Sequence, residues 1–266
     1  MIKAASLFPV ALLALFAMPA SAQEVVDLEL VLAVDVSRSM DIEEQAIQRA
    51  GYSAAFRHRD VIAAITGGMH GRIAVAYVEW AGAGAENIVV PWTIIAGEAD
   101  SLAFAAKLDG TGVNRYSGTS IASGLLLSAA LIEGNKINGL RRVIDVSGDG
   151  PNNIGPPVEP TRDAIVGRGI AINGLPIMLR PGGGFFSIEQ LDAYYEDCVI
   201  GGPAAFMIPV RAAEEFPEAI RRKLVLEIAG TEARVIFAAA NTENRGKMDC
   251  LIGEKLRGRW YYGNDR

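Results

Sequence analysis

The sequence predicts an α/β protein whose doubly wound, mostly parallel sheet carries helices on both faces. Two observations predict it: short continuous apolar runs, and segments of helical periodicity that alternate with those runs along the chain. Strands that alternate with helices require crossover connections, which make the strands parallel and lay the helices over the sheet. In such sheets ligands bind beyond the carboxyl ends of the strands, so we expect the functional residues there.

The first predicted strand is Leu28–Val36, which is apolar at nearly every position before Asp35. Such a run is typical of a strand that is buried on both faces. A helix is expected directly afterwards, because Asp41 and Glu44 have the spacing of a capping box and apolar residues then recur at helical intervals.

The next two strands are predicted to form a hairpin. Arg72–Trp80 and Asn87–Ile95 are both strand-like, and only Ala81–Glu86 connects them. Pro91 places the second of these strands at an edge of the sheet, because proline has no N–H to donate to a ladder.

The rest of the chain continues the alternation. We expect helices around Asp100–Leu108, Ser120–Ile132, Thr161–Gly167, Ile188–Tyr195 and Glu214–Ala229, and strands at Arg141–Val146, Ile170–Ile177 and Ala204–Pro209. A short strand at Arg234–Ala238 is a further expectation. No linker divides the chain, so 23–266 is interpreted as one domain with a C-terminal extension from about 230.

Residues 1–22 are predicted to be a signal peptide. Lys3 precedes an apolar run from about Ala4 to Met18, and the small residues Ala20 and Ala22 suit cleavage after Ala22. The run is short for a membrane span, and no later stretch is long and apolar enough for one. We therefore expect a periplasmic or secreted protein without a transmembrane segment in the mature chain; a retained N-terminal anchor is the alternative.

The two cysteines of the chain, Cys198 and Cys250, are expected to form a disulfide, because export places them in an oxidising compartment. Closing a loop of this length stabilises a fold by roughly 4 kcal/mol in the chain-entropy model. Two buried free thiols are the alternative.

The composition argues against several classes of function. With 25 Lys and Arg against 31 Asp and Glu, the net charge is −6, which disfavours a nucleic-acid partner. The 2 histidines cannot build a His-rich zinc site and give thin support to a Ser-His-Asp triad. Gly110-Thr111-Gly112 lacks the third glycine of a dinucleotide fingerprint.

Three oxygen-rich turns follow predicted strands or open a predicted helix. They are Asp35-Val36-Ser37-Arg38-Ser39, Ser117-Gly118-Thr119-Ser120 and Ser147-Gly148-Asp149-Gly150. If they meet at one edge of the sheet, they offer two carboxylates and several hydroxyls but no imidazole or thiolate. Such hard ligands suit Mg²⁺ first, then Mn²⁺ or Ca²⁺. Two carboxylates and one divalent ion are neutral together, so the ion can still attract an anionic oxygen from another protein.

The order of these motifs resembles the metal-ion-dependent adhesion site of von Willebrand factor A (VWA) domains, over roughly 27–229. The resemblance implies that the cation is held, in part through water, by Asp35, Ser37, Ser39, Thr119 and Asp149. It also implies a partner protein that offers a carboxylate. The family commonly has Thr before the last Asp, where this chain has Gly148. Tyr77–Ala81 and Ile144–Asn153 further resemble an exported bacterial subgroup of this fold whose function is unknown. This second resemblance therefore implies no particular activity.

Other interpretations remain open at this point. The five residues also suit ordinary turns and helix caps. Besides a non-enzymatic, metal-dependent binding module, the chain is compatible with a metal-assisted hydrolase, in which Asp145 or Glu79 would activate water, and with a metal-free scaffold. We favour pairing of Asp145 within the core over a role in the site, and a core or rim position for Trp80.

Overall fold

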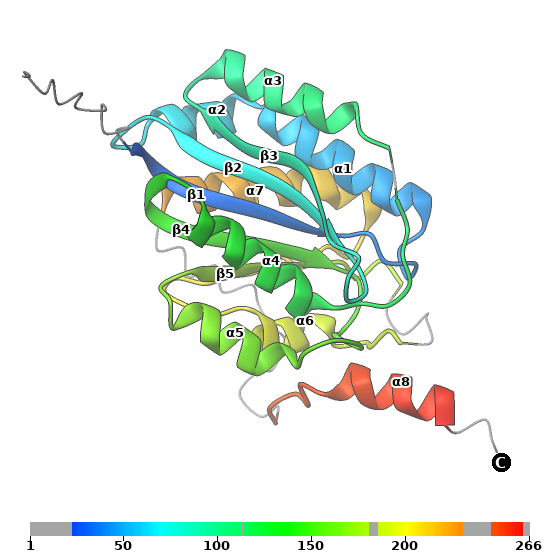
Figure 1. Ribbon diagram of the computed structural model, residues 1–266. Helices are drawn as coiled ribbons and strands as arrows, with labels where there is room; N and C mark the ends of the chain where they lie inside the picture. The colour runs from blue at the N-terminus through cyan, green and yellow to red at the C-terminus, as the bar shows by residue number, and fades with distance from the viewer. Residues whose placement is uncertain (1–22, 113, 181–185, 231–245, 263–266) are drawn as a thin grey trace, which may run out of the picture.

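A five-stranded sheet in the order β3-β2-β1-β4-β5 forms the centre of the protein (Figure 1). Its strands are β1 (Glu24–Asp35), β2 (Ile73–Trp80), β3 (Asn87–Ile95), β4 (Ile137–Gly148) and β5 (Ala171–Pro176). All neighbouring strands are parallel except β2 and β3, which form the predicted antiparallel hairpin with β3 at the edge. The computed structural model describes residues 23–112, 114–180, 186–230 and 246–262. The predicted signal peptide and the predicted strand at 234–238 lie outside them.

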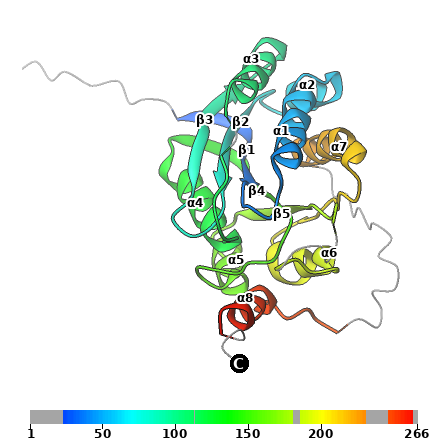
Figure 2. The same cartoon turned by 90° about the vertical axis from the view of Figure 1, so that its right-hand side faces the viewer.

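Helices cover both faces of the sheet, as predicted (Figures 1 and 2). One face carries α1 (Ile42–Phe56), α2 (Arg59–Thr66), α3 (Glu98–Asp109) and α7 (Phe216–Ala229). The other carries α4 (Ile121–Gly134), α5 (Val158–Val166) and α6 (Leu191–Tyr194). The molecule therefore has the mostly parallel α/β architecture that the sequence predicts.

The central strand β1 separates two apolar cores. Its even-numbered residues, among them Leu30 and Leu32, pack under α1, α3 and α7, whereas Val31 and Ala33 pack against α4 and α5. Side chains of a strand alternate between its faces, so a strand covered on both sides is apolar at successive positions. This explains the continuous apolar run in the sequence.

Two helices of the structure were not expected from the sequence: α2, and α8 (Ile252–Tyr262) near the C-terminus. His58 is the N-cap of α2, where its ring nitrogen accepts from the Asp60 N–H. The predicted helix at 188–195 is short: α6 continues as a π-helical turn at Tyr195–Val199.

The predicted strand Ala204–Pro209 is wrong as a continuous element. This segment makes one isolated bridge to β5, at Met207, and the next residue along, Val210, makes another to Ile177. Ala204 has a positive φ of 56°, and Pro209 has no N–H to donate, so the backbone cannot sustain a regular ladder.

Cys198 and Cys250 form the predicted disulfide, with Cα atoms 5.5 Å apart. It joins the π-helical turn to the residues that lead into α8, which lies beyond α5 and α6 at one end of the molecule (Figure 2). Among the residues that the structure describes, no helix has the length and apolar character needed to cross a bilayer.

Candidate metal site

The pairing of β1 with β4 brings Asp35 and Asp149 together. Val34 lies opposite Ser147 in the parallel register, so β1 ends at Asp35 beside the end of β4 at Gly148, and Asp149 follows. Both carboxyl groups therefore lie at the carboxyl edge of the sheet, where ligands of such folds bind. The two groups are close enough for the negative charge of Asp149 to raise the pKa of Asp35.

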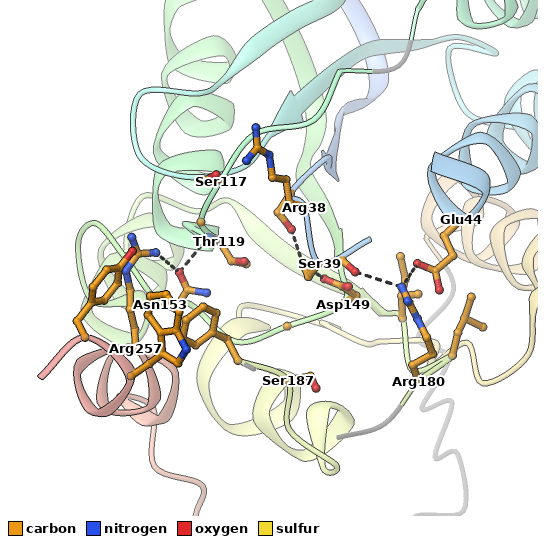
Figure 3. A pocket seen from close by; sticks show the side chains of 18 residues that line it. Arg38, Ser39, Glu44, Ser117, Thr119, Asp149, Asn153, Arg180, Ser187 and Arg257 are labelled. Atoms are coloured by element: carbon orange, nitrogen blue, oxygen red, sulfur yellow. Dashed lines mark hydrogen bonds and ion pairs between the residues drawn. The ribbon is translucent and has the colours of Figure 1, made fainter. Parts of the chain in front are cut away.

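A chain of hydrogen bonds links the first loop to Asp149. The Ser37 N–H donates to Asp35 Oδ1 at 2.7 Å, and the Ser37 and Ser39 hydroxyl oxygens lie 2.7 Å apart. The Ser39 hydroxyl donates to Asp149 Oδ1 at 2.6 Å (Figure 3). Two carboxylates and two hydroxyls from segments far apart in the sequence thus form one continuous cluster.

The loop that contains Thr119 is attached to the same cluster. Tyr116 forms an isolated parallel bridge with Ser37, and the Thr119 N–H donates to Asn153 Oδ1 at 3.0 Å. The Asn153 N–H in turn donates to the Thr119 carbonyl oxygen at 2.8 Å. Gly118 has a φ of 87°, which favours glycine and allows the sharp turn before Thr119.

The two carboxyl groups lie in surroundings that disfavour their charge. Burial, and after it the charge of Asp149, raises the pKa of Asp35 well above its ordinary value. Burial also raises the pKa of Asp149 to about 6, although the hydrogen bond from Ser39 opposes this shift. Asp35 is fully buried, and its Oδ2 has no hydrogen-bond partner. An unpartnered buried carboxylate oxygen is costly unless a cation or a proton compensates it.

Gly148 leaves room for a residue that the sequence did not single out, Tyr195. A Cβ atom at Gly148 would lie 2.9 Å from Asp35 Oδ2 and 3.1 Å from the Tyr195 hydroxyl. That hydroxyl lies 3.5 Å from the Gly148 carbonyl oxygen, and burial followed by the charges of Asp35 and Asp149 raises its pKa. Tyr195 therefore places a phenol in the space that a side chain at position 148 would occupy. The only sign of it in the sequence is the pair Tyr194-Tyr195 before Cys198, and such a pair is equally typical of residues that only pack in a core.

A cavity of about 420 Å³ opens in front of the cluster (Figure 3). Of the five predicted ligand residues, Ser37, Ser39, Thr119 and Asp149 line it, and Asp35 lies behind Ser37. On one side Arg180 pairs with Glu44 at 2.5 Å, and on the other α8 contributes Arg257. The participation of α8 was not predicted.

The remaining sequence candidates lie elsewhere. Asp145 is buried under α7 and pairs with Lys223 at 2.8 Å, which confirms the predicted core pairing. Glu79 is buried and pairs with Arg49, and Trp80 is fully buried in the core. None of these side chains lines the cavity.

A comparison with family models gives one match: residues 24–232 fit the model described as "Protein of unknown function (DUF1194)". The chain belongs to the DUF1194 family. A search of curated proteins found no match.

Solved structures show that this DUF1194 protein has the VWA fold. A von Willebrand factor type A protein from Catenulispora acidiphila is 14% identical with a TM-score of 0.54, over 76% of this chain and 43% of that one. The pilus adhesin SpaC from Lactobacillus rhamnosus GG is 13% identical with a TM-score of 0.56, over 76% and 30%.

A third structure is proximal thread matrix protein 1 from the mussel byssus, with zinc in its MIDAS motif, the metal-ion-dependent adhesion site. It is 13% identical with a TM-score of 0.53, over 78% of this chain and 49% of that one. The DUF1194 protein thus spans less than half the length of each of these three proteins. At these identities the likeness establishes the fold alone.

The residues present fit a small hard cation. Carboxylate and hydroxyl oxygens are the donors that Mg²⁺ and Mn²⁺ prefer, and the unpartnered Asp35 oxygen is compensated when a cation lies nearby. In the part of the chain that the structure describes, no group of three or more His, Cys, Asp and Glu side chains forms a metal site. An ion here therefore depends on hydroxyls and water in addition to two carboxylates.

Proposed function

We propose that this protein is an exported, metal-dependent binding module whose cation completes its coordination with a carboxylate of a partner protein. Asp35, Ser37, Ser39, Thr119 and Asp149 are the proposed ligands, with Mg²⁺ as the first candidate ion and Mn²⁺ or Ca²⁺ as the next. The cation supplies an electrophilic centre. One divalent cation and two carboxylates have no net charge together, so the site can still bind an anionic oxygen of the partner.

One observation carries the proposal: hard oxygens from three separate loops surround one cavity, and the buried Asp35 retains a carboxylate oxygen without a donor. An ordinary cluster of turns would satisfy that oxygen with an N–H. Export is supported by the predicted leader and by the disulfide, since disulfides persist in oxidising compartments.

A hydrolase would need a general base beside the ion. The two carboxylates considered for that role are engaged elsewhere: Glu79 pairs with Arg49, and Asp145 pairs with Lys223. Neither lines the cavity, so we propose binding rather than catalysis.

Calorimetric titration with Mg²⁺ and Mn²⁺ tests the site. Wild type is expected to bind one ion, and Asp35→Asn, which keeps the shape of the side chain but removes its charge, is expected to lose binding. Asp163→Asn is the matched control, because Asp163 lies on α5 with its side chain 64% exposed. Absence of binding in wild type would contradict the proposal and favour a metal-free scaffold. Metal-dependent turnover of ester or phosphoester substrates would favour a hydrolase.

A further inference from the structure

The helix α8 forms a wall of the cavity, although it lies beyond residue 232, where the family match ends. It contributes Arg257, Trp260 and Tyr261, and Phe186 from the segment before α6 lies beside them. None of these four residues is among the proposed metal ligands. The wall is therefore available to contact whatever the ion binds.

Several contacts fix this wall relative to Asp149. The disulfide holds Cys250 close to the start of the helix at Ile252, and Glu254 accepts from the Asn152 side-chain amide at 2.7 Å. At Gly253 an added Cβ would lie 2.1 Å from the Asn152 carbonyl oxygen, so the helix backbone packs directly on the loop that follows Asp149. The distance between the wall and the ion site is therefore set by the fold.

The cavity is bordered by guanidinium groups. Arg180 is neutralised by Glu44, whereas Arg38 and Arg257 pair with no carboxylate among the described residues (Figure 3). Arg257 donates instead to the neutral Asn153 side chain at 3.2 Å and lies over the Tyr261 ring. The Arg38 side chain points away from the Ser39–Asp149 cluster (Figure 3). With a divalent ion balanced by two carboxylates, Arg257 therefore gives this side of the cavity a local positive charge in a chain whose net charge is −6.

The wall also offers aromatic surface. Trp260 is 45% exposed, and its ring packs edge-on against Phe186 and Tyr261, at centroid distances of 6.1 and 4.8 Å. A partly exposed, laterally supported tryptophan beside charged groups is typical of the residues that dominate binding energy at protein interfaces.

We propose that α8 makes the site selective for one kind of ligand: an acidic segment of a partner protein that carries an aromatic or large apolar side chain next to the metal-bound carboxylate. This rests on the proposed function. The apolar side chain packs on Trp260 and Phe186, and a second carboxylate of the segment pairs with Arg257. The local positive charge favours a segment with more than one acid, and the aromatic surface favours a peptide over a small dicarboxylate.

Selection of short random peptides, displayed on phage and panned with Mg²⁺ against the disulfide-bonded protein, tests the proposal. We expect enrichment of sequences with two acidic residues and a neighbouring aromatic or large apolar residue, and loss of enrichment in chelator. For one selected peptide, Trp260→Ala and Arg257→Gln should each weaken binding about tenfold or more. Mg²⁺ affinity should not fall in either variant, because α8 supplies no ligand to the ion and Arg257→Gln removes a positive charge from the cavity.

Two matched controls test non-specific effects. Met69→Ala and Arg59→Gln change side chains that are 83% and 93% exposed away from the cavity, and both should bind the selected peptide like wild type. Helix content by circular dichroism and an intact disulfide show that α8 is retained in the test variants.

The outcomes separate the two proposals. If selected peptides are acidic and chelator-sensitive but bind Trp260→Ala and Arg257→Gln as tightly as wild type, the role of α8 is wrong and the metal-dependent function stands. If a small dicarboxylate such as succinate displaces the peptide at equal concentration, the peptide-specific part is wrong. If nothing binds in Mg²⁺, or binding ignores the chelator, the proposed function fails as well.

Discussion

At the scale of single residues, the buried carboxyl group of Asp35 and the half-buried carboxyl group of Asp149, at adjacent strand ends, create the chemistry of the site. Asp35 ends β1 and Asp149 follows β4, and burial raises the pKa of both. Their mutual repulsion costs free energy in the metal-free protein, and a cation removes it. Ser37 and Ser39 connect the two carboxyl groups without adding charge.

Asp149→Ala is accordingly expected to abolish Mg²⁺ binding while leaving the metal-free protein at least as stable as wild type, because one of two repelling carboxyl groups is removed. Calorimetry measures the first effect, and urea unfolding in chelator at pH 8 measures the second. A lower urea midpoint than that of wild type would contradict the predicted relief of repulsion.

Gly148→Thr is expected to destabilise the protein by about 1–3 kcal/mol, because its Cβ would meet Asp35 Oδ2 and the Tyr195 hydroxyl closer than van der Waals contact allows. Adding Tyr195→Phe should recover part of that loss, since it removes one of the two clashing atoms. Thermal unfolding of the two single variants and the double variant measures the coupling. Strictly additive losses would show that the two positions do not share this space.

At the scale of elements, the disulfide is the covalent connection between α8 and the segment behind the site. It bridges a sequence separation of 52 residues, from the π-helical turn after α6 to Cys250, which lies shortly before α8 begins at Ile252. The turn also contains Tyr195, so the bond attaches α8 to the segment that packs against Gly148.

Replacing both cysteines by serine is expected to lower the free energy of unfolding by about 4 kcal/mol or somewhat less, because the unfolded chain is no longer constrained. Hydrogen exchange should accelerate most in α8, which then depends on contacts such as the Glu254–Asn152 hydrogen bond. Mg²⁺ affinity should change little. Unchanged exchange in α8 would show that its other contacts are sufficient.

At the scale of the whole molecule, a second cluster of charged side chains is buried between α7 and the sheet, away from the cavity. Lys223 of α7 pairs with Asp145 of β4 at 2.8 Å and with Glu227 at 2.5 Å, so one cation faces two carboxylates. Burial first, and then the charge of Asp145, raises the pKa of Glu227 to about 7. Asn173 donates to Glu227 at 2.8 Å.

This cluster predicts that stability falls as the pH rises. Glu227 has an ordinary pKa of 4.5 when unfolded, so between pH 4.5 and about 7 the folded protein binds more protons than the unfolded chain, and folding loses stability through that window. Wild type is expected to lose on the order of 2 kcal/mol more free energy of unfolding between pH 5 and pH 8 than Glu227→Gln, because the glutamine does not titrate.

Urea unfolding across that range measures the effect as the difference between variant and wild type. Glu218→Gln, an exposed position on the same helix, is the control and should keep the wild-type slope. Equal slopes for all three proteins would show that Glu227 does not titrate in this range.

The sequence by itself determined the α/β class, the hairpin with β3 at the edge, the helix that begins after Asp41 and the pairing of the cysteines. Each depends on local signals: apolar runs, a capping box, Pro91 and the cysteine count. It also indicated the loops that gather around the cavity, because residues that follow neighbouring parallel strands must meet at one edge.

Only the tertiary structure decided which other residues border the cavity. Arg257 and Trp260 reach it through the packing of α8, and Tyr195 packs behind Gly148 from the π-helical turn. The spacing of these residues in the sequence carries no period that points to a site. The irregular segment at Ala204–Pro209 and the ion pair of Asp145 with Lys223 were decided there too. Long-range packing selects among conformations that local propensity leaves nearly equal in free energy, and that is why these features required the folded chain.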